Sequence, residues 1–431
     1  MRRRQRVLAV AASTIAAVSM LAACGGGGTQ SGASGEGVTM TLWHNSTTGD
    51  GKAYWEQTAK DFMAQKPGVT IEVVAVQNEE LDGKLQTAMN SGDAPDLFLA
   101  RGGGKLKDMV DAGQVQDITT TITDETKKAI GDAAFSALTI EDKIYGVPTA
   151  VLPGGIYYSK DLFAKAGITE TPKTMKDLSA AVDKLKAAGI QPIALGAKDA
   201  WPAAHWFYFF ALRECPQDVF TTASIEGNFS DPCWEKAAKD LQDFAGTEPF
   251  NKGFLTTSAQ QGAGSSAGLI ANHQAAMELM GAWNVGVIAD LTPDKKPLSD
   301  LGWFPFPAVD GGKGGAGAMM GGLDAYSCSA EAPKECAEFL NFFSQKKYAE
   351  LYADAYETIP ANTEAQGAVK QEALKDILVS YKDAPYVSVW LDTLLGQNVG
   401  NALNVGVVDM LAGKGDAKGV LTAVESAAAK E

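Results

Sequence analysis

Small and polar side chains follow two predicted strands at the points where those strands end. The strands are predicted for residues 38–43 and 96–99, and the residues that follow them include Asn45, Ser46, Arg101, Gly102 and Gly103. The carboxyl ends of parallel strands meet at one edge of a sheet, where ligands of such folds usually bind. Amide, hydroxyl and guanidinium groups at that edge supply paired hydrogen-bond donors and acceptors. We therefore expect a binding site for a polar ligand there.

An aromatic side chain is expected at a similar position. Trp283 follows Gly281 at the end of a strand predicted for residues 275–280, where its indole would overhang a cleft. A flat indole face packs well against a ring that has an apolar face of C–H groups. Polar neighbours can then bond hydroxyl groups around that ring. These residue types favour recognition of a hydroxylated ring.

The sequence offers little for catalysis, a metal or a cofactor. Residues 100–105 carry a glycine run without the spacing of a phosphate-binding loop or of a dinucleotide fingerprint. No CxxC pair is present, and His44, His205 and His273 are widely separated, so no metal site is expected. No carboxylate lies in a clear acid–base motif. We predict a binding protein without cofactor, and not an enzyme.

The composition is that of an acidic globular protein. There are 37 basic and 52 acidic residues, for a net charge of −15, and 45% of the residues are apolar. Four of the basic residues lie in the first six positions. Nucleic-acid binding is not expected, because phosphate contacts need clustered Lys and Arg.

The N-terminus has the pattern of an export signal. Arginines at positions 2–4 and 6 precede a short apolar run over 7–20, and Leu21-Ala22-Ala23-Cys24 leads into glycines. This tetrapeptide resembles a bacterial lipoprotein box, which implies cleavage before Cys24 and diacylation of its thiol. We expect residues 1–23 to be the signal, 24–37 a flexible tether, and the mature chain to lie on the extracellular face of the membrane. The alternative is an ordinary secretory signal with a chance cysteine.

The other cysteines are even in number, which fits an oxidising compartment. They can pair in three ways, and the two short local loops favour Cys215–Cys233 and Cys328–Cys336. The alternative is four buried free thiols.

Strand and helix patterns alternate at the start of the chain. Strands at 38–43, 69–76 and 96–99 are separated by helices at 52–65 and 81–89, which indicates an α/β fold with a parallel sheet. Further on, two extended pieces at 144–149 and 154–158 are separated by Pro and Gly, and we interpret them as a crossing between domains. Ile359-Pro360 is predicted to be a second crossing.

Several short motifs together resemble family 1 extracellular solute-binding proteins, the sugar receptors of bacterial ABC importers. They are Thr41-Leu42-Trp43, Gly92-Asp93-Ala94-Pro95-Asp96-Leu97, Tyr145-Gly146-Val147-Pro148, residues 157–163, Gly281-Ala282-Trp283 and Ile359-Pro360-Ala361. The resemblance implies a monomer with two α/β lobes, each a mainly parallel sheet flanked by helices, joined by a hinge with the ligand in the cleft. It also implies membrane-embedded ABC permease subunits as partners. The expected N-lobe is 38–149 with 318–356, and the expected C-lobe is 150–317 with 357–431.

The resemblance also implies further site residues. Trp390 matches the family's late stacking tryptophan, and Trp201 matches an aromatic side chain of the cleft. Polar candidates beside them are Asp324, Asn284, Asp392, Tyr356, Glu80 and His44. For His44 the alternative is that it braces a loop.

The ligand is expected to be a small carbohydrate. Residues 149–153 are apolar where maltose-binding protein has an acidic residue, which favours a ligand with fewer hydroxyls there, such as a pentose disaccharide. Xylobiose or a similar β-linked disaccharide comes first, with cellobiose, chitobiose and maltose left open. The alternatives are a secreted glycoside hydrolase, which would need two carboxylates flanking the cleft, or the same fold with a polyamine, metal or phosphate ligand.

Overall fold

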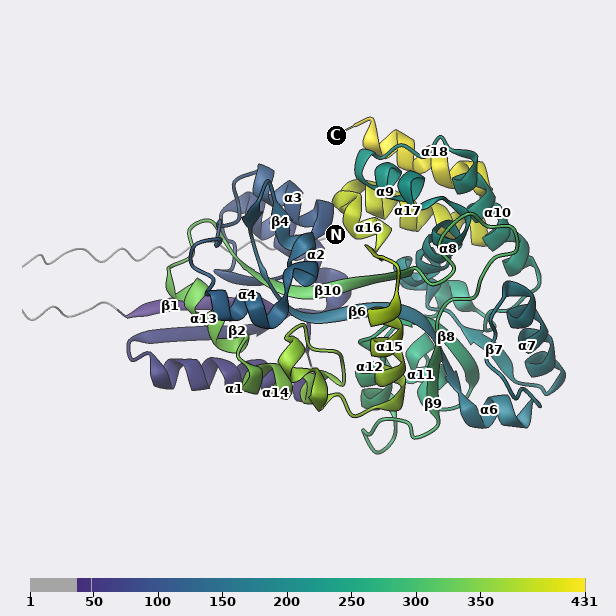
Figure 1. Cartoon of the computed structure of the whole chain (residues 1–431), viewed down its shortest axis with the longest axis horizontal. Coiled ribbons are helices and arrows are strands. Elements are labelled where there is room, and N and C mark those ends of the chain that lie inside the picture. The colour runs from purple at the N-terminus through teal and green to yellow at the C-terminus, as the bar shows by residue number, and fades with distance from the viewer. Residues whose placement is uncertain (1–36, 48, 431) are drawn as a thin grey trace, which may run out of the picture. The chain divides into compact units, whose positions relative to one another are not determined.

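The computed structural model of the protein describes residues 37–47 and 49–430, which form a mixed α/β structure around a nine-stranded sheet (Figure 1). The order along the sheet is β2-β1-β3-β10-β6-β8-β7, with β11 on β10 and β9 on β6. A separate pair consists of β4 and β5. The strands are β1 (Val38–His44), β2 (Val69–Ala75), β3 (Leu97–Ala100), β4 (Thr139–Ile140), β5 (Lys143–Ile144), β6 (Val147–Ser159), β7 (Gln191–Ala194), β8 (Ala275–Gly281), β9 (Leu301–Phe304), β10 (Met319–Cys328) and β11 (Val387–Val389).

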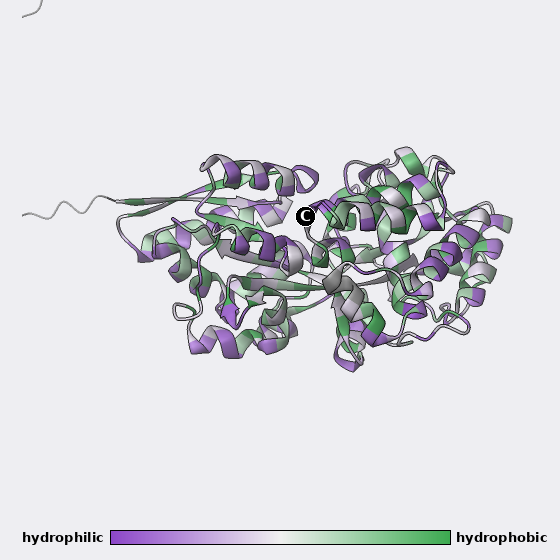
Figure 2. Cartoon of the chain, turned by 90° about the horizontal axis from the view of Figure 1, so that it is seen from above, coloured by the Kyte–Doolittle hydropathy of each residue, from purple (hydrophilic) through white to green (hydrophobic). Residues whose placement is uncertain are grey.

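Helices cover the sheet. In Figure 2 many of them carry both hydrophobic and hydrophilic residues, as amphipathic helices do. The helices are α1 (Gly49–Gln65), α2 (Asn78–Ser91), α3 (Gly103–Asp111), α4 (Asp124–Ile130), α5 (Asp132–Phe135), α6 (Lys160–Lys165), α7 (Met175–Ala187), α8 (Trp201–Glu214), α9 (Gln217–Glu226), α10 (Pro232–Gly246), α11 (Ser266–Ala271), α12 (Asn284–Leu291), α13 (Glu335–Phe343), α14 (Lys346–Tyr356), α15 (Glu372–Asp383), α16 (Leu391–Leu394), α17 (Gly396–Leu411) and α18 (Ala417–Ala428). No helix within the described ranges is both long and apolar enough to cross a membrane.

The first three strands run parallel, as predicted. β1 lies between β2 and β3, and α1 and α2 make the crossovers. Met40 and Leu42 alternate into the core along β1. The same order brings the carboxyl ends of β1 and β3 to one edge of the sheet.

The two extended pieces predicted around Pro153 are one continuous strand, so that prediction is wrong. Pro153 is the last residue of β6 that pairs with β10, and Gly154 is the first that pairs with β8. The Pro-Gly sequence therefore marks a change of partner within a 13-residue strand. β10 runs antiparallel to both β3 and β6 and was not predicted, because Gly321-Gly322 near its start weakens the strand pattern.

The aromatic residues between positions 201 and 210 lie on α8, and almost every side chain of this helix is buried. Its residues share one hydrophobic cluster with β8, α10 and the C-terminal helices α16 to α18. Leu106 of α3 belongs to a different cluster, together with Phe98, Leu138 and Tyr145. The α3 side and the C-terminal helices therefore have separate cores.

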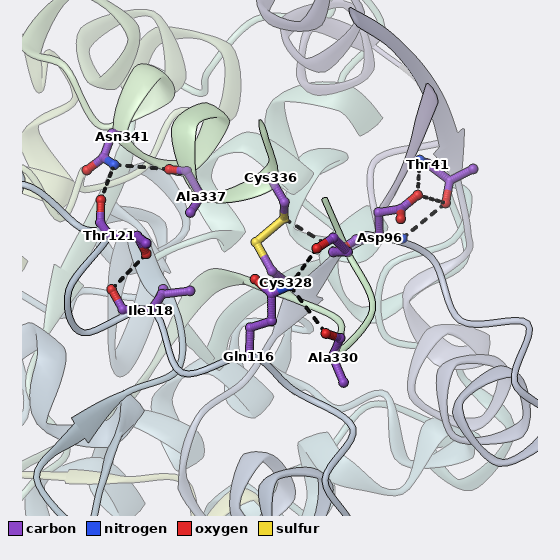
Figure 3. Close-up of a disulfide and its surroundings, with 11 residues drawn as sticks. Thr41, Asp96, Gln116, Ile118, Thr121, Cys328, Ala330, Cys336, Ala337 and Asn341 are labelled. Atoms are coloured by element: carbon purple, nitrogen blue, oxygen red, sulfur yellow. Dashed lines mark hydrogen bonds between the residues drawn. A yellow bond between two sulfur atoms is a disulfide. The ribbon is translucent and has the colours of Figure 1, made fainter. Parts of the chain in front are cut away.

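Both predicted disulfides are present, Cys215–Cys233 between α8 and α10 and Cys328–Cys336 between β10 and α13. Figure 3 shows the second one beside Asp96, whose backbone oxygen lies 3.5 Å from the Cys336 sulfur. The Asp96 carboxylate accepts a hydrogen bond of 2.8 Å from the Thr41 backbone N–H, so it braces β1 against β3. Cys24 and the predicted signal lie outside the described residues.

Candidate functional site

A cavity of about 1000 Å³ lies at the carboxyl ends of β1 and β3 and extends to residues after β7 and β8. Segments far apart in the sequence line it: the starts of α1 and α2, the strand β10, the end of α14, and the stretch from Trp390 into α17. This volume is at the upper end of the range found for small-molecule sites. The cavity can therefore hold a ligand larger than a single sugar ring.

Three tryptophans and one histidine of the lining form an aromatic cluster. The ring centroids of Trp283 lie 6.0 Å from those of Trp201 and 6.1 Å from those of Trp390, in edge-to-face arrangements. The His205 ring stacks on Trp390 at 4.0 Å with 8° between the planes. The tryptophans are thus adjacent to one another and form a continuous aromatic surface.

Glycines allow the indoles to lie close to the strands. A Cβ atom on Gly281 would come within 2.5 Å of Trp283 Cε3, and one on Gly154 would come within 2.5 Å of Trp390 Cη2. A Cβ atom on Gly322 would lie 2.7 Å from Trp390 Nε1. These distances are too short for any side chain, so the glycines of β6, β8 and β10 fix where the two rings lie.

Some polar atoms of the aromatic cluster have no hydrogen-bond partner among the described residues. They are Trp201 Nε1, Trp283 Nε1 and His205 Nδ1. A buried donor without a partner costs free energy, so these atoms are suited to bonding a polar ligand. Burial lowers the pKa of His205 to about 4, although Asp392 opposes the shift, so its ring is neutral at pH 7.

A charged network forms another part of the lining. The Arg101 guanidinium donates to Asn78 Oδ1 at 2.7 Å and lies 3.5 Å from both Asp82 and Asp324. Asn45 Nδ2 donates to the same Asn78 oxygen at 3.2 Å, and Lys105 Nζ pairs with Asp82 at 2.8 Å. The guanidinium has a planar fork of donors, so it can hold several acceptors at once.

The opposite charges of this network stabilise one another although the side chains are partly buried. Burial would raise the pKa of Asp82, but Lys105 and Arg101 more than offset it and hold the pKa at about 2. Burial also opposes the charge on Arg101, yet Asp82 and Asp324 raise its pKa. Burial raises the pKa of Asp324 despite Arg101. The ionised pairs can therefore present fixed donors and acceptors to hydroxyl groups.

Two more lining residues are held by hydrogen bonds of their own. Asp392 Oδ2 accepts from Asn404 Nδ2 at 3.0 Å, and Asn404 in turn accepts from the Tyr208 hydroxyl. The Tyr356 hydroxyl accepts from Trp55 Nε1 at 2.8 Å. Both side chains are thus oriented before any ligand arrives.

Most of the predicted site residues are brought together in this cavity. Those that line it are Trp283, Trp390, Trp201, Asn45, Ser46, Arg101, Asp324, Asp392 and Tyr356. The predicted Gly102, Gly103, Asn284, Glu80 and His44 are not part of the lining.

Each residue outside the lining has another local role, which corrects its predicted placement. His44 is buried and its Nδ1 accepts from the Ser46 backbone N–H at 3.2 Å, so it braces the loop, which was the alternative. Asn284 is buried and donates to Glu278 at 2.8 Å. Glu80 is exposed and pairs with Lys84 at 2.7 Å. Gly102 packs against the Ala137 carbonyl and Gly103 against that of Thr393.

Sequence reasoning missed several lining residues: Asn78, Asp82, Lys105 and, as part of the aromatic cluster, His205. Asn78 and Asp82 lie four residues apart, on one face of the helix α2. His205 lies four residues after Trp201 on α8, so the same spacing was a usable signal. No group of three or more potential metal-binding side chains occurs in the part of the chain that the structure describes.

Comparisons with known proteins identify a family for this chain. A family model described as bacterial extracellular solute-binding protein matches residues 45–350. An uncharacterised ABC transporter extracellular-binding protein of Pyrococcus horikoshii is 28% identical over 62% of this chain and 60% of its own length. The diacetylchitobiose binding protein of Streptomyces coelicolor is 26% identical over 82% of this chain and 81% of its own. A structure from work on xylan utilization by the thermophilic bacterium Caldanaerobius polysaccharolyticus superposes with a TM-score of 0.81 at 24% identity, covering 90% of this chain and 99% of that one.

Proposed function

Because the chain belongs to the bacterial extracellular solute-binding protein family and has its two-lobe fold, we propose that it is a sugar receptor of an ABC importer. It captures an oligosaccharide in the cavity between its lobes and delivers it to a membrane-embedded permease. Members of this family are binding proteins, so the alternative of a glycoside hydrolase is not retained.

The observation that carries this proposal is the union of an aromatic cluster with a charged network in one cavity. The indoles of Trp201, Trp283 and Trp390 offer aromatic surface to a sugar ring, and Trp201 and Trp283 also offer N–H groups without a partner among the described residues. Arg101 and its carboxylate partners offer paired donors and acceptors to the hydroxyls. Stacking of about 0.5–1.5 kcal/mol for each aromatic contact and charge-assisted hydrogen bonds of about 1.5–3 kcal/mol each are enough for micromolar binding.

The favoured ligand is xylobiose or a similar β-linked disaccharide. Leu152 on β6 lines the cavity within the apolar stretch 149–153, so this stretch itself supplies no carboxylate to bond a hydroxyl. The structure from the work on xylan utilization supports a xylo-oligosaccharide, and the diacetylchitobiose-binding relative supports a chitobiose-type ligand instead. The tryptophans argue against a polyamine, metal or phosphate ligand.

The lobes are proposed to be 38–149 with 318–356 and 150–317 with 357–431. The change of partner at Pro153-Gly154 in β6 lies near one of these boundaries, and the bridge between Ala150 and Pro360 lies near another. Closure of the lobes around the ligand would create the surface that docks on the permease. A lipid on Cys24 would hold the receptor, as a monomer, at the outer face of the membrane.

Intrinsic tryptophan fluorescence, titrated with xylobiose, cellobiose, chitobiose and maltose, tests this function. We expect a saturable change with micromolar or tighter affinity, strongest for xylobiose. Absence of any response to all four sugars and to their longer oligomers would contradict the sugar assignment. Mass spectrometry of membrane fractions tests the lipid: a diacylated Cys24 is expected at the mature N-terminus.

A further inference from the structure

The glycine run after β3 does not line the cavity but meets the C-terminal helices. A Cβ atom on Gly103 would lie 3.0 Å from the Thr393 carbonyl oxygen. One on Gly104 would lie 2.7 Å from the Gly396 nitrogen and would collide with the Leu394 carbonyl oxygen. The first turn of α3 and the turn between α16 and α17 therefore touch backbone to backbone, which only glycine permits here.

This contact joins two bodies with separate cores. On one side, Leu106 of α3 packs with Leu138 and Tyr145. On the other side, Leu395 packs in the cluster that contains Trp390 and α8. The two surfaces that meet at this contact therefore belong to different hydrophobic clusters, and within the described part of the chain no buried apolar side chain shared between those clusters holds them together.

Residues of the cavity flank the contact on both sides. Arg101 directly precedes the glycine run, and Lys105 directly follows it. Trp390 and Asp392 precede the partner turn, and Gln397 follows it. The contact therefore sets the distance between the charged network and Trp390.

A second contact joins cavity residues of the two proposed lobes. Gln261 Nε2 donates to Glu79 Oε2 at 2.8 Å, and both side chains line the cavity. Glu79 lies on α2, close in sequence to Asn78 and Asp82 of the charged network, while Gln261 lies in the loop before α11. The lobes are thus in contact through side chains as well as through the glycine backbone.

We propose that Gly103 and Gly104 are positioning residues for ligand binding, because they allow the closed form in which both lobes contact the ligand. This inference rests on the proposed receptor function and names its conformational control. A methyl group at position 104 would push the two turns apart and disfavour the closed form. Apparent affinity falls with the fraction of the binding-competent form, so the loss appears in binding although no ligand contact is removed.

The test compares Gly104→Ala with the wild type and with Gly246→Ala, a matched control. Gly246 lies at the end of α10 with nothing within 4 Å of its Cβ position. Calorimetric titration with the sugar that binds the wild type should show at least a tenfold loss of affinity for Gly104→Ala and less than a twofold change for Gly246→Ala. The thermal unfolding midpoints without sugar should stay within a few degrees of each other. Equal affinity in all three proteins would overturn the inference.

Small-angle X-ray scattering without sugar separates this inference from the function. If the wild type binds none of the sugars, the proposed function fails. The scattering data then test only whether the contact between Gly104 and the turn between α16 and α17 keeps the lobes closed. A larger radius of gyration for Gly104→Ala than for the wild type and Gly246→Ala supports the contact as the closing surface. Equal radii of gyration in the three proteins would overturn the closing role of this contact.

Discussion

The His205 imidazole lies parallel to the Trp390 indole, with 4.0 Å between the ring centroids and 8° between the ring planes. His205 is 3% exposed and Trp390 is 6% exposed, so one face of the indole is supported from within the protein. A ligand can therefore meet Trp390 only on the parts of the ring that His205 leaves free. His205 is thus a support for Trp390, which we propose as a binding residue.

Replacing His205 tests this support. His205→Ala should weaken sugar binding by about 2- to 10-fold, since a stacked aromatic pair contributes about 0.5–1.5 kcal/mol. His205→Phe keeps a flat ring under Trp390 and should retain most of the affinity. Calorimetric titration of both variants measures the difference. Equal losses in the two variants would show that the imidazole nitrogens, and not the stacking, matter.

The Arg101 network should contribute to stability as well as to binding. Arg101→Ala leaves Asp82 and Asp324 without their shared partner, and we expect the free energy of unfolding to fall by about 1–3 kcal/mol with weaker sugar binding. Lys84→Ala is the control, because it removes only an exposed ion pair with Glu80 and should change stability by less than about 0.5 kcal/mol. Urea denaturation measures both. Equal stabilities for the two variants would contradict the role of Arg101.

Glu278 should make stability depend on pH. Burial raises the pKa of Glu278 to about 7 from 4.5, although Asn284 and Ser266 oppose the shift. The folded protein then holds a proton that the unfolded chain has lost, so the stability that Glu278 provides disappears as the pH rises from 4.5 to 7. Glu278→Gln removes this dependence.

The difference in unfolding free energy, variant minus wild type, should therefore increase between pH 4.5 and pH 7. The expected slope is at most about 1.4 kcal/mol per pH unit. Denaturation curves collected across this range measure it. A difference that stays constant with pH would show that Glu278 is ionised throughout.

The spacing of apolar residues along the chain was sufficient to predict much of the fold. β1, β2 and β3 with their crossover helices follow from alternation and helical spacing. β10 was missed because Gly321 and Gly322 carry no β signal. A side chain on Gly322 would collide with the Trp390 ring, and one on Gly321 would collide with the backbone of Leu152 and Pro153. Pro153-Gly154 was interpreted as a break because a sequence does not show that a strand changes partner there.

Sequence reasoning located the tryptophans of the site better than their polar neighbours. Trp283 could be predicted because it lies just after an apolar strand, two residues after Gly281. Asn78 and Asp82 lie on a polar helix where any residue could face solvent, so only their shared face hinted at a role. Gly103 was predicted to contact the ligand, yet it contacts Thr393, a residue 290 positions away that local patterns cannot reveal.

The central claim is that Trp283 and its neighbours bind a sugar, and calorimetric titration of Trp283→Ala with xylobiose tests it most directly. Glu80→Ala, outside the cavity, is the control, and Trp283→Phe keeps a smaller aromatic face. We predict micromolar or tighter binding for the wild type and Glu80→Ala, an intermediate affinity for Trp283→Phe, and at least a tenfold loss for Trp283→Ala. Thermal unfolding of each variant shows that it is folded at the temperature of the titration. Undiminished affinity in Trp283→Ala would contradict the account.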